Sequence, residues 1–198
     1  MGHQRKFLAL GYEQRFRFLY LVVRENEKLI LKWLDDSFPG NVGDRNGAKE
    51  CIQNAFDFLG KLILPGIQVD RVENKELMLN GMADEVLSLS EEVSEMRGVK
   101  DFYRVTCALT SLEVLFTCVI DFFFSSEDYN HTSGSFHVIL LSSLADYSNI
   151  DFNHIFPEDV YKLDWQNFDV FCKDYPLLKR LMSNYIDRIF SSGNFPED

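Results

Sequence analysis

The sequence lacks the cysteine patterns of a metal centre or a disulfide scaffold. Four cysteines are present in 198 residues, and no two of them form a C-x-x-C pair. The intervals between them match neither zinc-ligand spacing nor a disulfide framework. We therefore expect free, buried thiols and a reducing compartment. The four residues are Cys51, Cys107, Cys118 and Cys172.

Long apolar runs are also missing. A membrane-spanning helix needs about 18 or more consecutive apolar residues, whereas the longest candidate run, Val114–Phe124, is interrupted by Asp121. The first residues, Met1–Lys6, do not open a secretory leader with an apolar centre. These features predict a soluble protein of the cytoplasm.

Catalytic signatures are scarce. There is no G-x-S-x-G motif, and Gly40–Asp44 resembles neither a P-loop nor a dinucleotide fingerprint. Ser133–His137 places hydroxyls near an imidazole, but Ser133 is better explained as a helix N-cap. Asp151 and His154 have the spacing of a shared metal ion on a helix, yet no second histidine has matching spacing. We therefore expect no catalytic residue, metal or cofactor.

Paired carboxylates occur in the segment 76–96 without the partners that chemistry requires. Glu85 and Glu92 lie seven residues apart, and Ser88 and Leu89 occupy the intervening turn. No Glu-x-x-His motif accompanies them, so a di-iron bundle is not supported. We interpret these acids as a solvated helix face.

Basic residues are nearly absent from residues 121–170, which contain nine acids and one base, Lys162. This quarter of the chain therefore carries a net charge of −8 out of −11 for the whole. It also contains eleven Phe, Tyr and Trp residues. Because phosphate binding needs clustered Lys and Arg, the charge argues against nucleic acid and anionic membranes as ligands.

Hydrophobic periodicity of about 3.6 residues predicts an all-α fold, and no strand pattern rises above noise. We expect a compact bundle of six or seven helices in a single domain spanning residues 1–198. The predicted helices are Tyr12–Leu34, a helix capped by Asp44 and ended by Pro65, Glu76–Met96 with a possible break at Gly81, Lys100–Phe124, a helix from Ser133 through Tyr147, a helix that starts at Pro157, and Leu177–Phe190. Lys100–Phe124 is the most apolar of them, and we expect it at the centre of the bundle.

Three segments resemble a known family. They are Arg15–Asn26 followed by Gly43–Asp44, the helix containing Ala55–Leu59, and Asp174–Arg180. Their residues and spacing are similar to those of the uncharacterised all-helical family that includes the enterobacterial protein YjaG. The resemblance implies a compact helical bundle without an established activity, and it carries over no catalytic residue. The acidic segment 121–170 is not expected of that family.

Acid mixed with aromatic residues is typical of a surface that binds a basic protein. The sequence therefore favours an acidic, non-catalytic interaction protein, most concretely a bacterial immunity protein that neutralises a basic toxin such as a nuclease. The predicted partner-binding residues are Glu127, Asp128, Tyr129, Asp146, Asp151, Phe152, Glu158, Asp159, Tyr161, Asp164 and Trp165.

Two alternatives stay open at this point. One is a cytosolic housekeeping or scaffolding protein of the YjaG-like kind that has no tight partner. The other is an enzyme with a cavity between helices that uses Asp151, His154 or Glu92.

Overall fold

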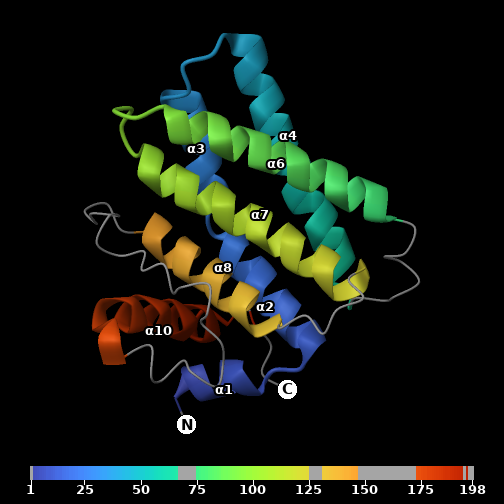
Figure 1. Cartoon of the computed structure of the whole chain (residues 1–198), viewed down its shortest axis with the longest axis vertical. Coiled ribbons are helices and arrows are strands. Elements are labelled where there is room, and N and C mark those ends of the chain that lie inside the picture. Colours follow the sequence, from blue (N-terminus) through green and yellow to red (C-terminus); the bar gives the residue numbers. More distant parts are fainter. Residues whose placement is uncertain (1, 67–74, 125–130, 147–172, 194, 196–198) are drawn as a thin grey trace.

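The computed structural model describes residues 2–66, 75–124, 131–146, 173–193 and 195, and within these ranges the chain is helical with no strand. The predicted all-α bundle is confirmed (Figure 1). The helices are α1 (His3–Ala9), α2 (Tyr12–Arg24), α3 (Glu27–Asp36), α4 (Val42–Ile63), α6 (Glu76–Glu95), α7 (Phe102–Phe124), α8 (His131–Ala145) and α10 (Pro176–Ser191).

Helix α7 lies at the centre of the bundle, with α6 along one side and α8 along the other (Figure 1). Helix α2 packs against α4, α7 and α8, while α3 packs against α4 and α7. Helices α1 and α10 contact each other at the end of the molecule where α8 and α2 also lie. The buried apolar side chains of all these helices form one continuous core.

The apolar composition of α7 explains its central position, as predicted. Leu109, Leu112 and Phe116 are fully buried. One side of the helix is less covered: Tyr103 is 49% exposed, and Thr110 and Val114 are partly exposed. Among the described helices, α7 is the one that is long and apolar enough to cross a membrane by length and composition, and half of that apolar window is buried inside the bundle.

The segment predicted as one helix, Tyr12–Leu34, is divided into α2 and α3 at Glu25 and Asn26. Both residues keep helix-like dihedral angles. The amide of Asn26 bonds to the Val23 carbonyl three residues back, at 2.9 Å, which tightens the turn. Hydrophobic periodicity continues through such a kink, so the pattern alone did not reveal it.

Helix α4 begins before the predicted cap. Its N-cap is Asn41, whose side-chain oxygen accepts hydrogen bonds from the amides of Gly43 (2.7 Å) and Asp44 (3.1 Å). The Asp44 carboxylate in turn accepts from the amide of Asn41 at 3.3 Å, which completes a capping box. The prediction that Asp44 is the cap was therefore wrong by three positions. Both residues of a capping box are of types that cap helices, so the sequence alone did not show which of them is the N-cap.

Other predicted helix ends have mixed outcomes. Helix α8 begins at His131, so Ser133 lies inside it and is not the N-cap. Helix α6 continues through Gly81 without a break. The last helix is confirmed: it has Pro176 at its start, and Gly193 just beyond its end has a φ of 70°. The helix predicted to start at Pro157 lies outside the described residues.

Helices α2 and α4 approach closely where Tyr20 meets Gly60. The Tyr20 side chain is buried, and its hydroxyl donates to the Phe56 carbonyl (3.2 Å) and accepts from Arg24 (3.0 Å). A Cβ at Gly60 would lie 2.5 Å from that hydroxyl oxygen. The absence of a side chain at Gly60 therefore allows the two helices to pack.

Replacing Gly60 with alanine should destabilise the protein, although alanine favours helix formation by about 1 kcal/mol. Overpacking of this kind costs about 1–3 kcal/mol, and Tyr20 cannot withdraw without losing its buried hydrogen bonds. We expect the free energy of unfolding, measured in urea, to fall by about 1–2 kcal/mol. The same change in a Tyr20→Phe background should cost less, because the clashing hydroxyl is gone; an equal cost in both backgrounds would disprove the contact.

Candidate functional site

Of the eleven predicted partner-binding residues, Asp146 is the one that falls within the described part of the chain. The remaining ten lie outside it, and the structure therefore leaves their arrangement as a prediction. They are Glu127, Asp128, Tyr129, Asp151, Phe152, Glu158, Asp159, Tyr161, Asp164 and Trp165.

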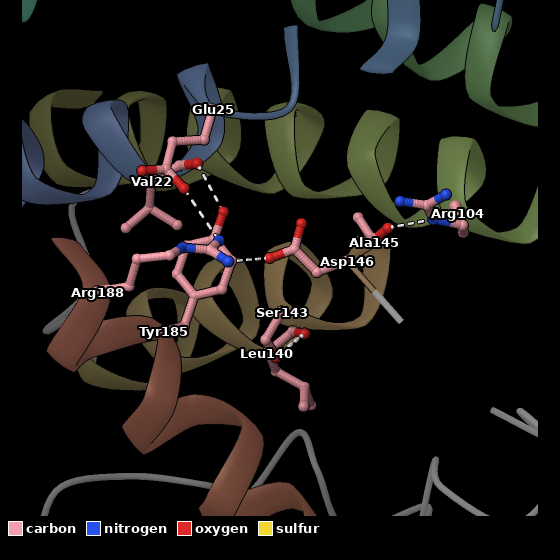
Figure 2. A network of polar contacts seen from close by, with 9 residues as sticks. All are labelled: Val22, Glu25, Arg104, Leu140, Ser143, Ala145, Asp146, Tyr185 and Arg188. Atoms are coloured by element: carbon pink, nitrogen blue, oxygen red, sulfur yellow. Dashed lines mark hydrogen bonds and ion pairs between the residues drawn. The ribbon is translucent and has the colours of Figure 1, made fainter. Parts of the chain in front are cut away.

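Asp146 directly follows α8 and forms an ion pair with Arg188 of α10 (Figure 2). Arg188 also pairs with Glu25, at the end of α2, at 2.9 Å. Its guanidinium lies 4.1 Å from the ring centroid of Tyr185. The charge of Asp146 is thus compensated inside the protein, which indicates a structural role for this residue.

Two further hydrogen bonds extend this network, as Figure 2 shows. The Tyr185 hydroxyl donates to the Val22 carbonyl of α2 at 3.3 Å. Burial raises the pKa of Tyr185, so the phenol keeps the proton that it donates. Arg104 of α7 donates to the Ala145 carbonyl at 2.8 Å, which satisfies a carbonyl at the C-terminus of α8. The network therefore joins the ends of α2 and α8 to α7 and α10.

Loss of this network should cost little stability, because its ion pairs are about 40% exposed and solvent screens them. We expect Asp146→Asn to lower the free energy of unfolding by less than about 1 kcal/mol. Arg188→Met should cost about 1–2 kcal/mol, since it also removes the contact with Tyr185. A double-mutant cycle measured in urea should give a coupling of about 0.5 kcal/mol. Strict additivity of the two changes would contradict the pairing.

A groove of about 670 Å³ separates the N-terminal half of α4 from the C-terminal half of α6. Four of its lining residues are acidic: Asp44, Glu50, Glu85 and Glu92. Among the described residues, no lysine or arginine lines it. The other lining residues are Phe38, Gly40, Gly47, Ala48, Cys51, Asn54, Ser88 and Leu89.

The two basic residues closest in sequence to these α4 acids are engaged elsewhere. Lys49 pairs with Asp35 of α3 at 2.8 Å. Arg45 donates to the Phe38 carbonyl at 3.3 Å. The acids of the groove are exposed, and the apolar side chains of Phe38 and Leu89 are buried beneath it. The Asp44 carboxylate is used in the capping box of α4, whereas no described lining residue supplies a base for Glu50, Glu85 and Glu92. The groove therefore combines an excess of negative charge with an apolar base.

Cys51 lies in this groove but is unsuited to nucleophilic chemistry. Burial, followed by the charge of Glu85 and a hydrogen bond to its carboxylate, raises the pKa of Cys51 to about 11. A thiol of this kind is almost fully protonated at neutral pH, whereas nucleophilic attack requires the thiolate. Cys51, Cys107 and Cys118 are free thiols, and the latter two are buried, as predicted; Cys51 is half-buried, and Cys172 lies outside the described residues.

Raising the pH should lower the free energy of unfolding, because the thiols of Cys107 and Cys118 are buried. Burial raises the pKa of each thiol from 9.0 to about 12. Below pH 9, which is about the pKa of these thiols in the unfolded chain, both the folded and the unfolded protein keep the thiols protonated. Above that pH the unfolded chain releases protons that the folded chain retains. Each thiol then lowers the free energy of unfolding by about 1.4 kcal/mol per pH unit.

Urea unfolding at about pH 8 and about pH 10 measures this effect. Between the two pH values, the free energy of unfolding should fall by about 2–3 kcal/mol less for the variant Cys107→Ala/Cys118→Ala than for the unsubstituted chain. The comparison uses the pH-dependent difference, so the cavities that the substitutions leave cancel. Equal losses in the two proteins would show that these thiols do not titrate as burial implies.

The sequence indicated one wall of the groove as an exposed acidic helix face, which the structure confirms for Glu85 and Glu92, but it did not indicate the groove itself. Glu85, Ser88, Leu89 and Glu92 were recognised as one stretch of helix but interpreted as a solvated face. The structure places all four on the groove wall. The α4 residues Glu50, Cys51 and Asn54 were not predicted as a site. Their spacing with Asp44 and Gly47 follows one helical face, and this was the available signal.

The other chemical candidates do not form a site in the described residues. Ser133 and His137 both lie inside α8, without the strand-to-helix turn that a nucleophile elbow requires. No group of three His, Cys, Asp or Glu side chains suited to a metal ion occurs in the part of the chain that the structure describes. The pair Asp151 and His154 lies outside that part.

Comparisons with protein-family models, curated proteins and solved structures give no match to this chain. The YjaG-like resemblance therefore stays a prediction, and the function is argued from the geometry of this molecule.

Proposed function

We propose that this chain is an acidic, non-catalytic interaction protein that binds a basic protein partner in the cytoplasm. Its most concrete form is a bacterial immunity protein that neutralises a basic toxin, such as a nuclease, by direct binding. The observation that carries the proposal is the groove between α4 and α6, which has four carboxylates and no lining base among the described residues. The chain as a whole has a net charge of −11.

Electrostatics explains how such a surface would work. A negative groove attracts a positive partner over distance, and this attraction can raise association rate constants from about 10⁵–10⁶ to about 10⁸–10⁹ M⁻¹s⁻¹. Fast capture is what inhibition of a toxin requires, and it needs no catalytic residue. The acidic segment 121–170 would add to the same field through its net charge of −8.

Affinity capture tests the proposal directly. The full chain, immobilised at low ionic strength, should retain a strongly basic protein from lysate of its native host. With that protein purified, the association rate constant should fall at least about tenfold between low salt and about 0.5 M salt, since exposed charges are then screened. An association rate that does not change with salt would reject the electrostatic mechanism.

The toxin form makes a stricter prediction. Expression of the captured protein alone should arrest growth, and co-expression of this chain should restore it. A captured protein that is harmless when expressed alone would exclude the immunity role while leaving the binding role in place.

A further inference from the structure

Two glycines of α4 differ in their surroundings. At Gly60 an added Cβ would lie 2.5 Å from the Tyr20 hydroxyl, so internal packing accounts for the missing side chain. At Gly47 nothing lies within 4 Å of an added Cβ, and the residue is exposed on the groove wall. Glycine inside a helix is less stable than alanine, and no contact in the described structure offsets that cost. Gly47 leaves the backbone of α4 bare within the groove.

The length of the groove along α4 suits a short helical segment. Its α4 wall extends from Asp44 to Asn54, which corresponds to about 15 Å of helix or about three turns. Three turns of a docked helix present side chains at i, i+3 or i+4, and i+7 on one face. The bare backbone at Gly47 permits the close approach that helix packing requires.

The lining specifies the chemistry of that segment. Phe38 and Leu89 form an apolar base that suits apolar side chains at the centre of the docked face. Glu50, Glu85 and Glu92 are exposed along the groove and suit Lys or Arg at its edges. An anionic or neutral segment would leave these carboxylates uncompensated.

The geometry points to this groove as the docking site for a cationic amphipathic helix of the basic partner, whose backbone passes over Gly47. The inference rests on the proposed function and adds to it the place and the shape of the contact.

Charge variants on two faces of α6 test the location. Glu85→Gln/Glu92→Gln removes two charges from the groove, whereas Glu91→Gln/Glu95→Gln removes two exposed charges that do not line it. The probe is a fluorescein-labelled peptide of about 18 residues with Leu at helical spacing and Lys elsewhere. Its dissociation constant, measured by fluorescence anisotropy, should rise about tenfold for the groove variant and less than about threefold for the control, because salt-screened charges outside the site contribute little.

A second pair of variants tests the approach at Gly47 without changing charge. Gly47→Gln fills the groove, while Gly81→Gln adds the same side chain to an exposed, open position of α6 that does not line it. Both should fold at least as well as the unsubstituted chain, since Gln forms helix better than Gly. Gly47→Gln should weaken peptide binding at least about tenfold, and Gly81→Gln should leave it unchanged within about twofold.

The rate at which Cys51 is alkylated reports whether the peptide occupies the groove. In a Cys172→Ser background at about pH 9, where about 1% of a thiol with a pKa of about 11 is thiolate, iodoacetamide labels Cys51 slowly. The Lys peptide should slow this labelling further, since the thiol lies in the groove. A matched peptide with Glu in place of Lys should not slow it.

The outcomes separate the two proposals. If the chain binds the Lys peptide no better than the Glu peptide, both the docking site and the electrostatic basis of the proposed function are overturned. If the Lys peptide is preferred but the two charge variants weaken binding equally, and Cys51 is not protected, the groove assignment is overturned and the basic-partner function stands.

Discussion

The burial of α7 between α6 and α8 is the constraint on which the rest of the structure depends. Its apolar side chains, among them Leu109, Leu112 and Phe116, are removed from water only if helices cover it on both sides. One covering helix is α6, whose other face forms a wall of the acidic groove. The other is α8, whose end is attached to α10 through Asp146 and Arg188. The central helix thus positions both polar regions without contributing to the groove.

The two polar regions use negative charge in opposite ways. Asp146 and Glu25 share the guanidinium of Arg188, so their charges are balanced within the protein and join helix ends. In the groove, Glu85 and Glu92 have no basic neighbour among the lining residues that the structure describes. Repulsion between like charges is tolerated there at some cost to stability. The balanced acids hold helix ends together, whereas the unbalanced acids are the basis of the proposed attraction to a basic partner.

Much of the fold could be predicted because hydrophobic periodicity is a local property. The apolar spacing in Lys100–Phe124, the Pro176 start and the Gly193 stop all act within one or two turns. Helix α1 was missed, since its seven residues are too few for a periodic signal. It is held by Phe7, whose ring lies 4.8 Å from that of Phe18, and that contact is invisible in the local sequence. The kink at Asn26 escaped for a different reason: the chain there stays nearly helical.

The sequence by itself determined the all-α class, the central position of the most apolar helix and the excess of negative charge, because composition and short-range spacing are enough for each. Only the tertiary structure decided which acids share a surface. Asp44 and Glu92 are 48 positions apart in the sequence yet line one groove, whereas Asp146 is matched with an arginine 42 positions away. The reason is physical: Coulomb interactions depend on distance in space, and packing brings together charges that are remote in the chain.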